Sequence, residues 1–313
     1  MFILMLIILI VFPFDAQIGA REGLKTAFET VIPSVLPFSV GVSALVYSGM
    51  AQKLAQLLLP LARIFGINPY GMGVFVCSFL AGYPTGCKMV CDMYRAELLD
   101  KAEAEKILAY ANNGGIIFAL NVCGGVFGNQ RAGLVIFLIS VAATFVVAVM
   151  LGQSQAKDVC TQKNKKLPFM AVMGKAVASA GGVILNITAS FVVFYALCNA
   201  LKLNKLPFIE GCVEMTKGIM YAGGVKSLPL GAFFFTLGGV GVLSQSAAIC
   251  SECDLSLKWY IKGKIISSLL AFLLGYLISG DGFLTKDIIL FSVLALIAVG
   301  CAIRIIKKLY ASA

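Results

Sequence analysis

Long apolar runs separated by short polar breaks make up most of this sequence. A helix that crosses a bilayer needs about 20 largely apolar residues, and charges inside such a run are costly. The pattern therefore predicts an all-α polytopic membrane protein with roughly seven spans. The predicted spans are residues 1–14 (a slightly short one), 23–50, 101–127, 131–152, 176–201, 257–279 and 288–303.

Two further apolar segments have the wrong composition for a simple spanning helix. Residues 82–88 combine two glycines, a proline and a lysine, and Asp92 follows one turn later. Residues 228–253 are interrupted by three glycines at 238–241 and by a polar trio at 244–246. Irregular backbone and charge at membrane depth are tolerated only where protein buries them or a water-filled cavity receives them. We predict that each segment forms a re-entrant helical hairpin.

Polar residues also interrupt the predicted span at 101–127. Asp100 and Glu103 have the spacing of a capping box, which predicts that a helix starts at Lys101. That helix meets two asparagines and two glycines at 112–115. Two amide side chains beside two glycines at mid-span favour unwound backbone.

The N-terminal region leaves two interpretations open. Residues 1–14 have no basic residue in front of their apolar run, which favours an uncleaved, short first helix, and cleavage near Ala20 is the alternative. In the next span, Pro33 and Pro37 lie four residues apart. Each lacks an N–H donor, so we expect the helix to bend or to be interrupted there.

The order of segments is the same in both halves of the chain. Each half has a span, a partly polar amphipathic stretch, a glycine-broken segment and two further spans. Because a hairpin adds no crossing, each half crosses an odd number of times, and the second half is inverted relative to the first. The chain therefore divides into an N-terminal membrane helix (1–22), a first repeat (23–152), a polar linker (153–175) and a second repeat (176–313).

The composition supports the membrane assignment. Hydrophobic residues make up 60% of the chain and charged residues 13%, about half of the roughly 25% that soluble domains carry. The net charge of +10 comes from basic residues in connecting segments and near the C-terminus, where such clusters face anionic lipid. We therefore expect a multi-pass cell-membrane protein in contact with the lipid bilayer, with no nucleic-acid partner.

The inventory of reactive side chains excludes several kinds of chemistry. Ten cysteines and no histidine leave no standard zinc site, so we expect no metal and no cofactor. Most cysteines lie in apolar segments, where cysteine packs as a small hydrophobe. Two closer pairs are Cys87 with Cys91 and Cys250 with Cys253. The sequence contains no P-loop, which argues against ATP-driven transport by this chain alone.

The candidate binding residues lie at the broken segments. A half-helix that begins at mid-membrane directs unpaired N–H groups and a positive dipole end at an anionic or carboxylate-bearing ligand. We expect one such N-terminus at 85–88 and the other at 244–246, with amide groups between them. The predicted substrate-binding residues are Thr85, Gly86, Lys88, Asn112, Asn113, Glu214, Thr216, Gly239, Ser244 and Gln245.

Glu214 and Thr216 have three expected roles. They would pair with Lys88, couple a co-transported ion (H⁺ or Na⁺), or take up a proton.

Several of these stretches resemble one known family, the YlbJ-type sporulation integral membrane proteins. That family carries the nucleoside recognition (Gate) domain and is related to concentrative nucleoside transporters. The resemblance extends from near Gly23 to near Tyr276. The matching stretches are 23–24, 33–38 (Pro-Ser-Val-Leu-Pro-Phe), 82–88 (Gly-Tyr-Pro-Thr-Gly-Cys-Lys), 92–95, 101–105, 112–113, 214–218, 238–239, Gln245 and 254–258.

The resemblance implies a membrane bundle with two re-entrant hairpins and a role in endospore formation. Such proteins are linked to the passage of dipicolinic acid from mother cell to forespore, which implies the outer forespore membrane as the location. This chain departs from the family at 114–116, where Gly-Gly-Ile replaces Ser-Gly-Pro. It also has Gly241 and Leu243 where a serine and a histidine are usual.

Three classes of function are compatible with these observations. The first is a membrane transporter for a small anionic or nucleoside-like solute, which accounts for the polar groups at the broken helices. The second is a non-transporting integral membrane protein of sporulation or assembly, although the chain offers no sizeable soluble domain to recruit partners. The third is an intramembrane enzyme that uses its cysteines, but no histidine is present to activate a thiol. We therefore expect no enzymatic activity, and an oligomer is compatible with the first two classes.

Overall fold

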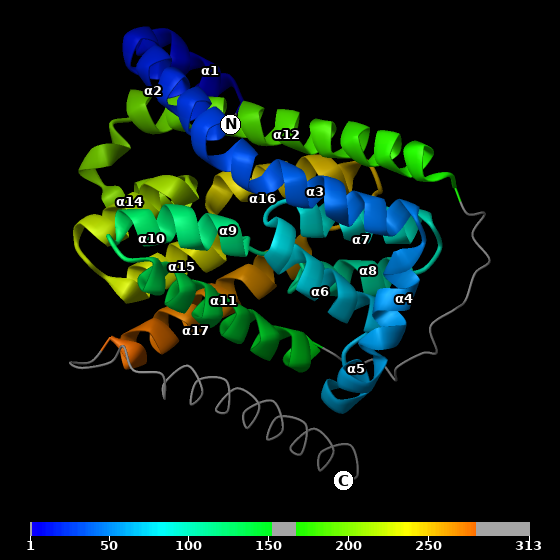
Figure 1. Ribbon diagram of the computed structural model, residues 1–313. Helices are drawn as coiled ribbons and strands as arrows, with labels where there is room; N and C mark the ends of the chain where they lie inside the picture. Colours follow the sequence, from blue (N-terminus) through cyan, green and yellow to red (C-terminus); the bar gives the residue numbers. More distant parts are fainter. Residues whose placement is uncertain (1, 152–166, 280–313) are drawn as a thin grey trace.

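All regular structure that the computed structural model describes, in residues 2–151 and 167–279, is helical. The all-α class is therefore confirmed for this part of the chain, and its helices pack around a large cluster of buried apolar side chains (Figure 1). The elements are α1 (Phe2–Val11), α2 (Pro13–Thr26), the π-helical turn η1 (Ala27–Val31), α3 (Ile32–Tyr47), α4 (Met50–Leu57), α5 (Leu59–Phe65), α6 (Pro69–Ala81), α7 (Thr85–Arg95), α8 (Lys101–Leu108), α9 (Ile116–Phe118), the π-helical turn η2 (Ala119–Cys123), α10 (Gly124–Val126), α11 (Gln130–Leu151), α12 (Phe169–Ala200), the 3₁₀ turn η3 (Leu203–Lys205), α13 (Pro207–Val213), α14 (Met215–Gly224), α15 (Leu228–Leu237), α16 (Gly239–Ser251) and α17 (Lys258–Ile278).

Five helical stretches in the described residues are long and apolar enough to cross a bilayer. They are Pro13–Tyr47, Gln130–Leu151, Phe169–Ala200, Leu228–Ser251 and Lys258–Ile278. The pair α5 and α6 passes the same test together but is bent by 105°. The expected number was seven: the expected span at 288–303 lies outside the described residues, and those at 1–14 and 101–127 are not among the candidates because their helices are short or interrupted. Leu228–Ser251, expected as a hairpin, is one of the five candidates. Large apolar side chains such as Ile265, Leu269 and Leu273 are exposed on α17, as side chains facing lipid are.

The first long span differs from its prediction at both ends and in its interior. Its helix begins at Pro13, ten residues before the predicted start at Gly23, and runs to Tyr47. The helix continues past both prolines, and Pro37 lies inside α3. A proline removes the N–H partner of the carbonyl one turn earlier. The helix adapts through the π-helical turn η1, which lies directly in front of the prolines.

The long helices form two sides of the bundle, with the short elements between them (Figure 1). Helix α12 packs along α2 and α3, whereas α11, α15 and α17 pack against one another on the other side. Helix α7 contacts α3, α6, α8 and α16 in the interior. The interrupted helices are therefore placed where protein, and not lipid, receives their unpaired backbone groups.

The two segments predicted as hairpins both contain a helix break at glycine. Helix α6 ends at Ala81, the chain turns through Gly82, and α7 begins at Thr85 and packs against α6. Helices α15 and α16 meet at Gly238, which has a left-handed φ of 76° that favours glycine. Their main neighbours differ, since α15 packs chiefly on α11, α14 and α17 and α16 chiefly on α12, α7 and α13.

The predicted unwound stretch is confirmed. Helix α8 starts with the expected capping box of Asp100 and Glu103, and residues 112–115 have no helical structure. The chain just before this stretch is held between two helices at glycines. A Cβ atom on Gly86 of α7 would lie 1.8 Å from the carbonyl oxygen of Ala111, and one on Gly263 of α17 would lie 2.1 Å from that of Ala109.

Candidate functional site

A lysine on α17 lies at the centre of the buried polar groups. Lys264 is 3% exposed, and its Nζ donates to Tyr83 Oη at 2.9 Å, to Asn113 Oδ1 at 3.2 Å and to the Thr236 carbonyl at 3.3 Å. Three acceptors match the three N–H groups of an ammonium. Among the described residues, no carboxylate lies within ion-pair distance of Lys264. The site therefore holds a buried lysine amino group without an acidic partner among the described residues.

The partners of Lys264 come from three separate breaks in the helices. Tyr83 belongs to the turn between α6 and α7, Asn113 to the unwound stretch, and Thr236 to the last turn of α15. Tyr83 Oη also donates to the Thr236 carbonyl at 2.9 Å, so it bridges the two halves of the chain. The Lys264 Nζ lies 4.7 Å from the centre of the Tyr83 ring, within the range of a cation–π interaction.

The two asparagines of the unwound stretch are both buried and both bonded. Asn113 Nδ2 donates to Ser78 Oγ at 2.9 Å and to the Tyr110 carbonyl at 2.7 Å. Asn112 Nδ2 donates to Ser246 Oγ at 2.9 Å, and its Oδ1 accepts from the backbone N–H of Cys87 at 3.4 Å. The amides therefore join α6, α7 and α16 to the group around Lys264.

A small cavity of about 30 Å³ lies beside this network, and we call it the inner cavity. Its lining includes Tyr83, Glu214 and Gln245, together with glycines of the turn and of the unwound stretch. A cavity of this size holds a water molecule or two. The structure thus shows the inner cavity in a closed state, too small for a nucleoside or an aromatic dicarboxylate.

Glu214 lies at the edge of the inner cavity and begins α14. Its Oε2 accepts the backbone N–H groups of Thr216 at 2.8 Å and of Lys217 at 3.3 Å, and it contacts the Thr216 hydroxyl. This helix start lies outside the five candidate spans. Burial raises the pKa of Glu214, and the hydrogen bonds from Thr216 and Lys217 oppose that shift. The side chain can therefore hold a proton at a higher pH than an exposed glutamate.

A larger cavity of about 450 Å³, which we call the outer cavity, has Thr216 of this helix start in its lining. The π-helical turns η1 and η2 both contribute to its lining, through Glu29 and Asn121 among others. Such turns are frequent at functional sites. Thr216 lines the outer cavity and Glu214 lines the inner one. The hydrogen-bonded pair therefore marks the boundary between the two cavities.

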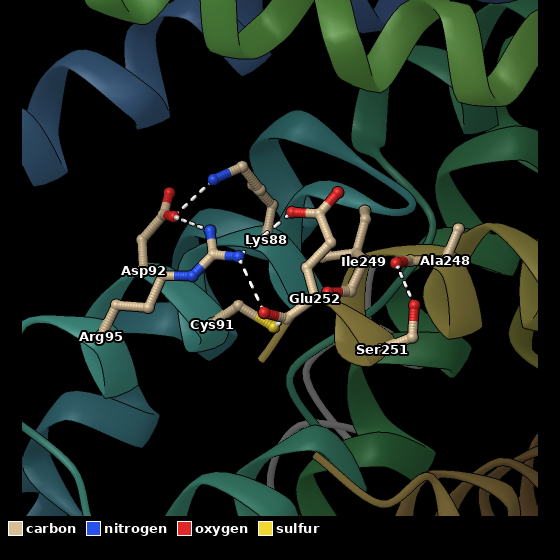
Figure 2. A network of polar contacts seen from close by, with 8 residues as sticks. All are labelled: Lys88, Cys91, Asp92, Arg95, Ala248, Ile249, Ser251 and Glu252. Atoms are coloured by element: carbon tan, nitrogen blue, oxygen red, sulfur yellow. Dashed lines mark hydrogen bonds and ion pairs between the residues drawn. The ribbon is translucent and has the colours of Figure 1, made fainter. Parts of the chain in front are cut away.

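Lys88 does not join the predicted site. It forms an ion pair with Asp92 on its own helix, and Arg95 lies 3.9 Å from the same carboxylate (Figure 2). The expected pairing of Lys88 with Glu214 is therefore wrong, because Asp92 one turn along α7 offers a nearer partner. The other two residues of that helix start, Thr85 and Gly86, are buried, with Thr85 Oγ1 2.9 Å from Ser39 Oγ.

The second predicted half-helix starts earlier than expected. Helix α16 begins at Gly239, whose φ is 74°, so Ser244 and Gln245 lie inside the helix and not at its N-terminus. The reason is that two successive glycines in left-handed conformations end α15 and start α16. Gln245 still lines the inner cavity, whereas Ser244 Oγ lies 3.3 Å from Ser190 Oγ on α12.

Lys264 is the central residue that the sequence analysis missed, because basic residues had been assigned to connecting segments. A helical projection of α17 contains the signal. Lys264 shares one face with small and hydroxyl side chains at 267, 268, 271 and 275, all of them buried. A lysine at a membrane flank would instead share its face with solvent or lipid.

Comparison with known proteins supports the membrane class. The chain is 23% identical over 278 residues to the sporulation integral membrane protein YlbJ of Bacillus subtilis (strain 168). The alignment covers 81% of this chain and 66% of that protein, so the chain spans just under two thirds of the relative's length. No family model and no solved structure matches. With five candidate spans and this similarity, the chain is a multi-pass integral membrane protein that is similar to a sporulation protein.

Proposed function

We propose that this chain is a secondary transporter for a small anionic solute and that it acts in endospore formation. The observation that carries the proposal is the buried Lys264, which has three neutral acceptors and no acidic partner among the described residues. An uncompensated charge at membrane depth is expensive. A bound anion supplies the missing countercharge, and this explains why the lysine is kept in the interior.

The two cavities support a route for such a solute. The outer cavity has room for a small molecule, and the Glu214–Thr216 pair separates it from the inner cavity. Transport requires this boundary to open and the inner cavity to expand. The helix breaks at Gly82 and Gly238 lie beside the network and are suited to such a movement. We extend the proposal to two inverted repeats whose re-entrant hairpins rock against each other.

In the proposed cycle each polar residue has a defined role. Lys264 attracts the solute's carboxylate, and Tyr83 and Asn113 turn their hydrogen-bonding groups from the lysine towards the solute. Burial raises the pKa of Glu214, so the side chain takes up a proton when it is buried and releases it when it is exposed to water. We therefore favour H⁺ over Na⁺ as the co-transported ion.

The solute class follows from the charge of the site and from the similarity. YlbJ is named as a sporulation protein, and the sequence resemblance implies dipicolinate, a dicarboxylate, as the solute. We propose dipicolinate passage into the forespore through the outer forespore membrane. A nucleoside-like solute, the other expectation of the resemblance, has no net charge to compensate Lys264.

The test is uptake of radiolabelled solute by purified protein in liposomes, with dipicolinate, a simple aliphatic dicarboxylate and a nucleoside compared. Dipicolinate uptake should be observed, and Lys264→Met should lower it at least tenfold. The matched control is Lys262→Met, since Lys262 lies on the same helix but is exposed and rests on the Trp259 ring. This control should keep wild-type uptake.

Thermal unfolding in detergent establishes that both variants are folded. Wild-type rates in folded Lys264→Met would overturn the role of the lysine. Absence of flux for all three solutes with folded wild-type protein would reject transport and favour the alternative, a non-transporting integral membrane protein of sporulation or assembly.

A further inference from the structure

Four cysteines from distant parts of the chain meet at the interface of α7 and α16. Cys87 and Cys91 lie one turn apart on α7, and Cys250 and Cys253 lie at the end of α16 and just after it. All four are buried and none is in a disulfide. The cluster borders the Lys264 network, because the backbone N–H of Cys87 donates to Asn112 Oδ1.

The four sulfur atoms form a row that alternates between the two segments. Cys253 interacts with Cys91, and Cys91 interacts with Cys250. Cys250 Sγ then lies 4.0 Å from Cys87 Sγ. Cys91 Sγ also points at the carbonyl of Ile249 at 3.8 Å, and Figure 2 shows Cys91 facing Ile249 and Glu252 across the interface. The row runs from the end of the bundle towards the unwound stretch.

The outer end of the row is the part that solvent can reach. Cys253 is 8% exposed, and it is followed by Asp254, whose side chain is almost fully exposed. Beside it, Arg95 pairs with Glu252 at 3.1 Å on the surface of the protein (Figure 2). Cys87, at the inner end, is 0% exposed. A reagent in solution therefore meets Cys253 first.

The geometry favours thiol chemistry over a metal site. Within residues 2–151 and 167–279, no group of three or more histidine, cysteine or carboxylate side chains is arranged to hold a metal ion. A disulfide needs its two sulfur atoms about 2 Å apart. Closing the 4.0 Å gap between Cys87 and Cys250 takes rotation of two side chains on helices that are already in contact.

We propose that this row is a redox latch, in which thiol–disulfide exchange with a small-molecule disulfide enters at Cys253 and ends in a Cys87–Cys250 disulfide that ties α7 to α16. The Cys253 thiolate attacks the small disulfide, forms a mixed disulfide and releases one thiol. Cys91 then attacks the Cys253 sulfur, forms a protein disulfide and releases the second thiol.

The disulfide then moves inward by two further exchanges. Cys250 attacks the Cys91 sulfur and frees Cys253, and Cys87 attacks the Cys250 sulfur and frees Cys91. Each exchange breaks one S–S bond and forms one. In total, two cysteine thiols are oxidised, the small disulfide is reduced to two thiols, and the two protons end on those thiols.

The surroundings of Cys253 determine the rate. Burial raises the pKa of the Cys253 thiol to about 12, the contact with Cys91 adds to the shift, and Arg95 lowers and Asp92 raises the value. Because the thiolate is the attacking form, the disulfide forms slowly at neutral pH and faster as the pH rises, about tenfold per unit between pH 7 and 9.

The experiment exposes the full chain in liposomes to oxidised glutathione and maps disulfides by mass spectrometry. We expect a Cys87–Cys250 cross-link that dithiothreitol reverses and that forms about ten times faster at pH 8 than at pH 7. Cys253→Ser should slow it at least tenfold. Cys198→Ser, which removes a buried cysteine on α12, should leave the rate unchanged.

Two results would overturn the proposal. One is that all four cysteines stay free thiols in folded protein after prolonged exposure. The other is a Cys253→Ser variant that cross-links at the wild-type rate, because the reagent then does not enter at Cys253. Cross-linking is read out by mass alone, so its outcome is independent of whether the protein transports dipicolinate.

Discussion

At the scale of single residues, Glu214 combines burial with three donors to one carboxylate oxygen. The balance of these effects leaves its pKa raised above the ordinary value. Between the ordinary pKa and the raised pKa, Glu214 is therefore protonated in the folded state and ionised in the unfolded state. Linkage then makes the folded state most stable below the ordinary pKa and less stable as the pH rises through the raised one.

We therefore expect the unfolding free energy of the wild type to fall with rising pH above 4.5, the ordinary value for Glu214, with a slope of at most about 1.4 kcal/mol per pH unit from this group. In Glu214→Gln this part of the slope should vanish. The remaining slope comes in part from Glu210, whose pKa burial also raises.

Equilibrium unfolding in detergent at several pH values measures this slope. Glu97→Gln is the matched control because Glu97 is exposed, and it should keep the wild-type slope. An unchanged slope in Glu214→Gln would show that the carboxyl group titrates alike in the folded and unfolded states.

A residue of the candidate site could be found from the sequence only when the unusual pattern was local. The unwound backbone at Asn112 and Asn113 was predicted correctly, because two amides next to two glycines in an apolar run are anomalous by themselves, and the binding role of the two residues stays a prediction. Lys264 looked ordinary at the start of an apolar helix. Its role depends on Tyr83, which lies 181 residues away in the chain and only becomes visible once the fold brings them together.

At the scale of elements, the end of α8 is fixed by the two close contacts at Gly86 and Gly263. Any side chain at either glycine would meet backbone atoms, which cannot rotate away as a flexible side chain does. The unwound stretch is thereby held in register with both α7 and α17. This is the physical reason why Asn112 and Asn113 reach their partners.

Gly86→Ala should destabilise the protein by about 1–3 kcal/mol, the usual cost of overpacking, or more if the backbone resists. The matched control is Gly182→Ala, in the interior of α12, where an added methyl group would meet nothing within 4 Å. That change should be neutral or stabilise by up to about 1 kcal/mol, because alanine favours helix over glycine.

Unfolding equilibria of both variants in detergent provide the measurement. Equal stability of Gly86→Ala and the wild type would mean that α7 and the end of α8 can separate at no cost. The role of this contact in positioning the asparagines would then be lost.

The element boundaries show where sequence patterns are sufficient. The capping box at Asp100 and the helix break at 112–115 follow from local chemistry, and both were predicted. The start of α16 was placed five residues late, at 244 and not at Gly239, because polar side chains were weighed above the glycine pair. The start of α2 at Pro13 was missed because the charged residues of α2 resemble a polar break between helices. Part of α2 is buried by packing on α12, and the sequence does not show this contact.

At the scale of the whole molecule, the outer cavity is large and the inner cavity closed, with Glu214 and Thr216 between them. A transporter that exposes its site to one side at a time must have such a closed boundary in each resting state. For the transporter that we propose, this structure would be one end state of its cycle, and that assignment predicts which positions a reagent in water can reach.

In a background without cysteines, Asn121→Cys should react at least tenfold faster with a charged, water-soluble thiol reagent than Val242→Cys. Asn121 is exposed in the outer cavity, whereas Val242 is buried at the inner one. Addition of dipicolinate should accelerate the reaction of Val242→Cys. Similar rates for both positions without solute would contradict a closed inner cavity.

The long-range partners of the unwound stretch have a consequence for biosynthesis. Asn112 bonds to a serine 134 residues further along the chain, and Asn113 to a lysine 151 residues further along. A ribosome makes these partners long after residues 112–115 have emerged. Until then Asn112 Nδ2 and Asn113 Oδ1 lack these partners in the membrane and depend on water or on insertion factors, whereas the bonds of Asn113 Nδ2 to Ser78 and Tyr110 form within the first half. A chain truncated before α17 would keep Ser246 but lack Lys264, so Asn113 Oδ1 would stay without this donor, and quality-control proteases could recognise the unfinished molecule by it.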